Sequence, residues 1–182
     1  MTTERIAAEA STLVLVDYQQ RLMPLIDGHG PVLHEALRLA DAAAALDIPI
    51  VGTQQNPAGL GHNDVRIRQR CAITLDKMHF DACEDGLVAA LGDRPAVVLA
   101  GCEAHVCLLQ TALGLLRAGR RVWVVAPACG SRSPSDRVLA LDRMARAGAG
   151  LVSVEMVLFE WLHDCRHPQF KNVLAVIKRG PP

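Results

Sequence analysis

Short apolar segments alternate with longer amphipathic segments along the chain. The short segments are rich in Val, Ile and Leu and contain few polar residues, which is typical of strands buried on both faces of a parallel sheet. The longer segments place apolar residues at helical spacing, and the one that starts at Pro134 has proline in its first turn. We expect strands at 12–16, 48–53, 72–75, 95–100, 121–125 and 151–153, and helices at 32–46, 85–91, 107–118, 134–147 and 168–178.

This alternation indicates a sheet with helices packed on both faces. A loop rich in Gly, Pro and Asn is expected at 54–63, and no repeat, low-complexity tract or linker interrupts the pattern. We therefore predict an α/β protein whose single domain spans residues 1–182. Its architecture would be a three-layer α/β/α sandwich with a mostly parallel, six-stranded sheet of Rossmann-like topology.

The composition narrows the class of protein. Of the 182 residues, 51% are hydrophobic and only 3% are aromatic, so the core must be mainly aliphatic. The 19 basic residues balance the 19 acidic residues, and no basic patch stands out, so we do not expect a nucleic acid partner. The low net charge fits a chain that buries surface in a homo-oligomer, a dimer or larger.

The sequence also suggests a location. Its N-terminus lacks the charged and apolar pattern of a secretion signal, and no apolar run is long enough to span a bilayer. We expect a cytoplasmic protein with no membrane partner. In that reducing compartment the irregularly spaced cysteines should remain free thiols. They are Cys71, Cys83, Cys102, Cys107, Cys129 and Cys165.

Three chemically capable residues follow apolar runs: Asp17, Lys77 and Cys107. Parallel α/β sheets bind ligands beyond the carboxyl ends of their strands, so an acid, an amine and a thiol would meet in one pocket if these strands are neighbours. We expect Cys107 to open a helix, where the amide-rich N-terminus favours a thiolate over a thiol.

Each of these residues also has a structural interpretation. Asp17 could cap a helix or lie in a turn, Lys77 could lie on the surface, and Cys107 could be a small buried apolar residue. The last interpretation suits Cys71, Cys83, Cys129 and Cys165, and it also fits Cys102 fairly well. We favour the functional interpretation for the three residues at the strand ends because of their shared position.

Several other kinds of site are disfavoured. Cys102, His105 and Cys107 lack a fourth ligand at a recognisable spacing, so we expect no metal; His62 and His79 are expected to be isolated surface or loop residues. The glycine motifs of dinucleotide and phosphate binding and the serine hydrolase elbow are absent as well. We expect no cofactor.

Four segments together resemble the isochorismatase-like cysteine hydrolases, and in particular the isochorismatase-domain-containing subgroup of animals and bacteria. They are 13–19, 53–57, 76–80 and 101–107, and the stretches 124–132 and 167–171 also fit. The resemblance covers nearly the whole chain. The three catalytic motifs are weak singly and specific together, because they occur in the family's order and spacing.

The resemblance implies a role for each matching residue. Cys107 would be the nucleophile, Asp17 would take its proton and pass it to the leaving group, and Lys77 would hold Asp17. A cis peptide bond between Cys102 and Glu103 would direct the amides of Glu103 and Cys107 into an oxyanion hole. The residues expected to line the pocket are Tyr18, Gln19, Gln55, Phe80 and His105.

The chain departs from two family patterns. The metal cluster that family nicotinamidases carry after the second strand is replaced here by the segment 54–62, which puts a metal and nicotinamide in doubt. True isochorismatases lack the nucleophilic cysteine, whereas this chain has Cys107. Gln54 also stands where related proteins often have Glu.

These observations predict a metal-free hydrolase of a small amide-like or acyl substrate that acts through a thioester on Cys107. Two alternatives remain open. One is a non-catalytic oligomeric binding or scaffold protein, and the other is a redox protein that uses Cys102 and Cys107. These patterns do not identify the substrate, because the sequence does not determine the shape of the loops that line the pocket.

Overall fold

The computed structural model describes residues 4–179. Its centre is a six-stranded sheet in the order β3-β2-β1-β4-β5-β6, and every neighbouring pair of strands is parallel. The predicted α/β fold with its six strands is therefore confirmed, and the sheet is fully parallel. The strands are β1 (Ser11–Val16), β2 (Ile50–Gln55), β3 (Ile73–Lys77), β4 (Ala96–Gly101), β5 (Arg121–Val125) and β6 (Gly150–Val152).

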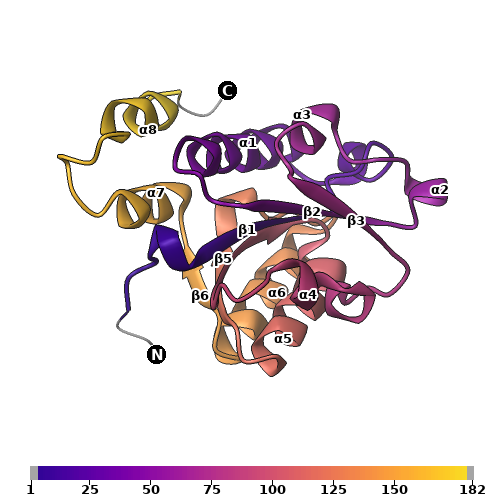
Figure 1. Cartoon of the computed structure of the whole chain (residues 1–182). Helices are drawn as coiled ribbons and strands as arrows, with labels where there is room; N and C mark the ends of the chain where they lie inside the picture. The colour runs from indigo at the N-terminus through magenta and orange to yellow at the C-terminus, as the bar shows by residue number, and fades with distance from the viewer. Residues whose placement is uncertain (1–3, 180–182) are drawn as a thin grey trace.

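Helices cover both faces of this sheet. Figure 1 shows α1, α7 and α8 on one side and α4, α5 and α6 on the other, so the chain forms three layers. The longer helices are α1 (His29–Ala45), α5 (Leu109–Arg117), α6 (Pro134–Arg146), α7 (Val154–Leu162) and α8 (Phe170–Ile177). The short helical segments are η1 (Ala8–Ala10), η2 (Met23–Leu25), α2 (Pro57–Leu60), α3 (Val65–Arg68), η3 (Ala82–Asp85), α4 (Leu87–Ala90), η4 (Ala104–Leu108) and η5 (Ala126–Ala128).

The core is aliphatic, as the composition predicts. Every residue of β1, β2 and β4 is buried, because each of these strands has neighbours on both sides and helices on both faces. Alanines on α1, such as Ala36, Ala40 and Ala43, are also fully buried, and their small side chains let the helix pack closely. Within residues 4–179, no helix has the length and apolar character needed to cross a bilayer.

Several element boundaries differ from the expectations. The helical segment expected to start at Cys107 starts earlier, at Ala104, because Ala104, Cys107 and Leu108 form a buried face at helical spacing. The helix α7, which was not expected, begins after Ser153, whose side chain accepts a hydrogen bond from the Met156 amide. The loop expected at 54–63 contains the end of β2 and the short helix α2.

The order of the strands reverses at β1. The chain moves from β1 outward through β2 and β3, and then returns to the other side of β1 to form β4, β5 and β6. In parallel sheets, ligands bind at such a reversal point, beyond the carboxyl ends of the central strands. The ends of β1, β2, β3 and β4 meet there, and we call this place the crevice.

Glycine is required where β4 meets β1 beside this crevice. Gly101 pairs with Val16, and a Cβ atom at Gly101 would lie 2.3 Å from the Val16 carbonyl oxygen and 2.5 Å from the Val16 Cβ. These contacts are too short for any side chain, and the oxygen belongs to the backbone of a buried strand. Only glycine lets the two strands approach this closely.

We predict that Gly101→Ala lowers the free energy of unfolding by about 3 kcal/mol, because the added methyl group forces β1 and β4 apart. Urea denaturation measures the change. The control is Gly30→Ala in α1, where a Cβ meets nothing within 4 Å, and this variant should be neutral or slightly stabilising. Equal stability of the two variants would show that the close approach is not a constraint.

Candidate active site

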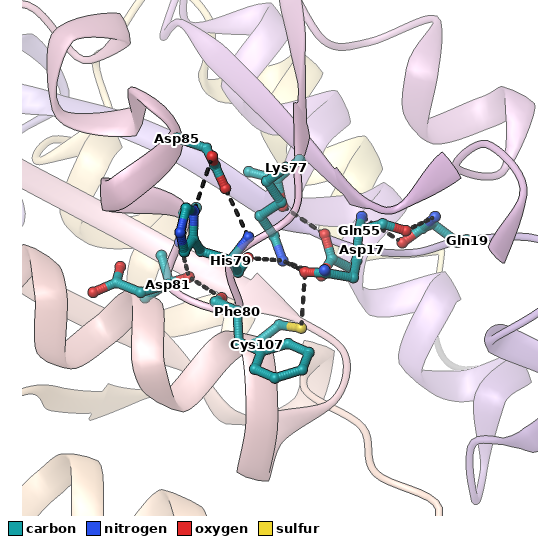
Figure 2. A network of polar contacts seen from close by, with 12 residues as sticks. Asp17, Gln19, Gln55, Lys77, His79, Phe80, Asp81, Asp85 and Cys107 are labelled. Carbon is teal, nitrogen blue, oxygen red and sulfur yellow. Dashed lines mark hydrogen bonds and ion pairs between the residues drawn. The ribbon is translucent and has the colours of Figure 1, made fainter. Parts of the chain in front are cut away.

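Asp17 and Lys77 form a buried ion pair at the crevice. Asp17 directly follows β1, and Lys77 is the last residue of β3. The strand β2 lies between β1 and β3, so the two side chains meet across it. The Lys77 Nζ lies 2.8 Å from Asp17 Oδ2, and both side chains are 0% exposed (Figure 2). Two buried charges of opposite sign stabilise each other in a medium that solvates neither of them.

Two residues of β2 hold this pair. The Thr53 hydroxyl donates a hydrogen bond to Asp17 Oδ1 at 2.7 Å. The Gln55 side-chain oxygen accepts one from Lys77 Nζ at 2.6 Å, and its side-chain nitrogen donates to the Met78 carbonyl at 2.8 Å. Gln55 thus lies in the site, as expected, whereas sequence analysis assigned no role to Thr53.

The Cys107 thiol completes the cluster. Its sulfur lies 3.9 Å from the Gln55 side-chain oxygen that Lys77 also contacts (Figure 2). Cys107 is 6% exposed and lies inside the π-helical turn η4. The structure therefore brings together the three residues that the sequence places at separate strand ends.

Two features of the structure work against the thiolate that we expected at Cys107. Burial and, secondarily, the negative charge of Asp17 raise the pKa of the Cys107 thiol to about 12, while Lys77 partly opposes this effect. Cys107 is also not the first residue of its helical segment, so the helix N-terminus that was expected to favour a thiolate lies earlier, at Ala104. A thiol with a raised pKa needs a base to remove its proton before the sulfur can attack.

The segment before Cys107 is fixed against the loop after β5. The peptide bond between Cys102 and Glu103 is cis, in agreement with the resemblance. The Ala104 amide donates to the Gly130 carbonyl at 2.7 Å. The Glu103 carboxylate, in turn, accepts hydrogen bonds from the Arg132 amide at 2.9 Å and from the Arg132 guanidinium at 3.0 Å.

The remaining residues expected to line the pocket occupy different environments. The side chain of His105 is partly buried, with its Nδ1 3.0 Å from the Ser131 hydroxyl. Phe80 is 50% exposed and lies on the same side of the polar network as Cys107 in Figure 2. Both remain candidates for substrate contact.

Tyr18 and Gln19, by contrast, are fully buried and bind backbone groups of neighbouring segments. The Tyr18 hydroxyl donates to the Ala128 carbonyl at 2.5 Å, and burial raises the pKa of Tyr18. The Gln19 side chain accepts from the Gln55 amide at 2.8 Å and donates to the Gln55 carbonyl at 2.9 Å. Gln19 therefore fixes the backbone of the residue that contacts both Lys77 and Cys107.

The cysteines are all free. Cys102 and Cys129 are buried, as expected, and burial raises the pKa of Cys129 to about 12. Cys71 and Cys83 are partly buried. Cys165 is exposed, which contradicts its interpretation as a buried apolar residue.

Gln54 links two side chains next to the site. Its side-chain nitrogen lies 2.6 Å from Asp76 Oδ1 and 3.2 Å from His62 Nδ1, so His62 is not isolated. A glutamate at this position would face the Asp76 carboxylate, and the neutral amide avoids that repulsion. Similarly, His79 is exposed but pairs with Asp85 at 3.1 Å. Within the described chain, no cluster of three or more His, Cys, Asp or Glu side chains forms a metal site.

Comparisons with known proteins identify the family of the chain. The model of the isochorismatase domain matches residues 11–156. Isochorismatase domain-containing protein 2A from Mus musculus is 37% identical over 181 residues, which cover 98% of this chain and 87% of that protein.

Two solved structures have the same architecture. One, described as MAR1 ribonuclease from Caenorhabditis elegans, has a TM-score of 0.94 and 36% identity and covers 98% of this chain and 95% of its own. The other is YcaC from Pseudomonas aeruginosa, described with hexane-2,5-diol and covalent acrylamide. It has a TM-score of 0.88 and 25% identity, and the match covers 97% of this chain and 93% of that one.

We predict that Lys77→Met lowers the free energy of unfolding by about 3–5 kcal/mol, because it leaves the buried Asp17 charge unpaired. Adding Asp17→Asn should restore much of the loss. Urea denaturation of both variants provides the measurement, with Lys171→Met, on the exposed surface, as the matched control. If Lys77→Met lowered the free energy of unfolding no more than Lys171→Met does, the ion pair would not be important for stability.

Proposed function

Because the chain belongs to the isochorismatase family, we propose that it is a cysteine hydrolase that cleaves a small amide-like or acyl substrate through a thioester on Cys107. The observation that carries this proposal is the meeting of a thiol, a carboxylate and an ammonium group at the crevice of the sheet. Gln55 contacts both the ammonium group and the thiol, so the three groups form one connected cluster.

The first step forms the thioester. Asp17 takes the proton from the Cys107 thiol as the sulfur bonds to the substrate carbonyl carbon. The amides of Glu103 and Cys107 stabilise the negative oxygen that develops. The carbon–nitrogen bond then breaks, and Asp17 gives its proton to the departing amine.

The second step releases the acid. Asp17 takes a proton from water as the oxygen of that water adds to the thioester carbonyl carbon. The carbon–sulfur bond breaks, and the proton on Asp17 returns to the sulfur of Cys107. The balance is one amide and one water consumed, and one acid and one amine formed. Lys77 lies 2.8 Å from Asp17 Oδ2 and stabilises the negative charge of the carboxylate between proton transfers.

The resting thiol is consistent with this scheme. A thiol whose pKa is raised to about 12 is a poor nucleophile by itself, so reaction depends on the carboxylate beside it. The structure of the Pseudomonas relative carries covalent acrylamide, a small amide with an electrophilic carbon. This relative supports a substrate of similar size for the present chain.

RNA cleavage is a second candidate, because the Caenorhabditis elegans relative is described as a ribonuclease. We favour the amide reaction on electrostatic grounds. RNA binding relies on basic surface that neutralises phosphates, and this chain has 19 basic against 19 acidic residues. The three site residues are also buried: Asp17 is 0% exposed, Lys77 is 1% exposed and Cys107 is 6% exposed. Such burial suits a small substrate better than a polymer.

We predict that a panel of small primary amides contains at least one substrate that adds its acyl group to Cys107. Intact-mass spectrometry detects the adduct, and hydroxylamine should convert the trapped acyl group to a hydroxamate, because it attacks thioesters. Cys107→Ala should form no adduct, and Asp17→Asn should form it at least 100-fold more slowly. The matched control is Cys165→Ser, which should behave as the wild type.

Two outcomes would contradict the amide reaction. Cleavage of single-stranded RNA that is lost in Cys107→Ala would favour the ribonuclease activity. Binding of amides without any adduct or turnover would favour a non-catalytic binding protein.

We further propose that the chain acts as a homo-oligomer in the cytoplasm. Large apolar side chains lie exposed on the single chain, among them Met78, Leu139, Met156 and Phe159. Burial of such residues is a common reason for association. The free cysteines fit a reducing compartment.

Sedimentation equilibrium tests the assembly. At micromolar concentration we expect a mass that is a multiple of the 19.6 kDa chain, because association removes exposed apolar surface from water. A mass of one chain over the whole concentration range would contradict the proposal.

A further inference from the structure

We propose that Thr53 is the positioning residue of Asp17. Its hydroxyl bonds to Oδ1 and so leaves Oδ2, the oxygen beside Lys77, to receive the proton of Cys107. This inference rests on the proposed function, because it assumes that Asp17 is the base. It adds a residue on β2 to the machinery and explains how a carboxylate without a side-chain partner on its own strand keeps one orientation.

Thr53 is attached to Asp17 at two points. Its hydroxyl donates to Asp17 Oδ1 at 2.7 Å, and its carbonyl accepts a hydrogen bond from the Asp17 amide at 3.1 Å. Thr53 is 0% exposed and pairs with Val16, the residue before Asp17. Both the backbone and the carboxylate of Asp17 are therefore fixed to the same residue of β2.

The backbone of Asp17 depends on this attachment. Its φ of 55° lies in the left-handed region, which a residue with a side chain adopts only when its surroundings hold it there. The Thr53 carbonyl also accepts a hydrogen bond from the buried Asn63 side chain at 2.9 Å. Thr53 is thus itself restrained, and it can transmit that restraint to Asp17.

The two oxygens of Asp17 consequently have different environments. Oδ1 accepts the Thr53 hydrogen bond, whereas Oδ2 lies 2.8 Å from Lys77 Nζ. No donor in the described part of the chain is aligned to form a hydrogen bond with Oδ2. The basic oxygen is therefore on the side of Lys77, and rotation of the carboxylate would break the bond from Thr53.

The charge of Asp17 is felt by several titratable groups. Lys77 reaches it from β3, and the thiols of Cys107 in η4 and Cys102 after β4 both have pKa values raised in part by its negative charge. The orientation of this carboxylate therefore affects several neighbouring groups, and the hydrogen bond from Thr53 fixes that orientation.

Thr12 provides an internal comparison. It lies on β1, is 1% exposed, and its hydroxyl has no hydrogen-bond partner in the described part of the chain. Thr12→Val removes a buried hydroxyl that bonds to nothing, whereas Thr53→Val removes one that bonds to Asp17. The two substitutions are otherwise alike in shape.

The test is the rate at which iodoacetamide alkylates Cys107 at neutral pH. Peptide mass spectrometry resolves Cys107 from the other cysteines, and Cys165→Ser is the background because Cys165 is exposed. We expect Asp17→Asn to react about 100-fold more slowly than this parent, because it lacks the base.

Thr53→Val should slow this alkylation about 10-fold, because the carboxylate loses the hydrogen bond that fixes its orientation. Thr53→Ser should restore the parent rate, and Thr12→Val should leave it unchanged. A structural role alone would lower the free energy of unfolding without slowing the alkylation of the folded protein.

The outcomes separate the two proposals. An alkylation rate that falls in Asp17→Asn but is the same in Thr53→Val and in the parent would overturn the role of Thr53 alone. A rate that does not fall in Asp17→Asn would overturn the role of Asp17 as base and the proposed function with it. If Thr53→Val fails to fold, the comparison of Thr53→Ser with Thr53→Ala decides, because only serine retains the donor.

Discussion

The buried ion pair between Asp17 and Lys77 is the interaction on which the site depends. A carboxylate alone in this crevice would be strongly destabilised by loss of water, and so would an ammonium group alone. Together, 2.8 Å apart, the two groups stabilise each other inside the protein. This pair holds a carboxylate and an amine beside a thiol, and all three side chains are buried.

The topology of the sheet explains why these groups meet. The pair connects the end of β1 to the end of β3 across β2, and Cys107 approaches from β4 on the other side of β1. The reversal of strand order at β1 brings the carboxyl ends of these strands together, and Gly101 lets β4 approach β1 closely. β2 supplies the polar supports, because Thr53 contacts Asp17 while Gln55 contacts Lys77.

The sequence correctly predicts the features that depend on one residue and the pattern of its neighbours in the chain. Apolar runs predict buried strands, and Asp17 and Lys77 are identified by their position at the strand ends. The resting state of Cys107 could not be predicted in the same way, because it depends on burial and on the charge of Asp17 from another strand. The helix α7 was missed because its N-terminal cap at Ser153 was read as the end of a strand.

The role of Thr53 illustrates a second limit. Thr53 belongs to a segment that resembles the family, yet threonine is common in strands and nothing local marks its hydroxyl as functional. The signal that could have found it is the register of β1 against β2, which places Thr53 beside Val16 and hence beside Asp17. Register becomes known only when the sheet is assembled.

The central claim is that Cys107 rests as a protonated thiol and depends on Asp17 for its reactivity. The most direct measurement is the ultraviolet absorbance of thiolate, taken as the difference between the wild type and Cys107→Ala during a pH titration. The account predicts no thiolate from Cys107 through the neutral range, because burial raises the pKa of this thiol to about 12. A thiolate that forms with a midpoint near neutral pH would contradict it.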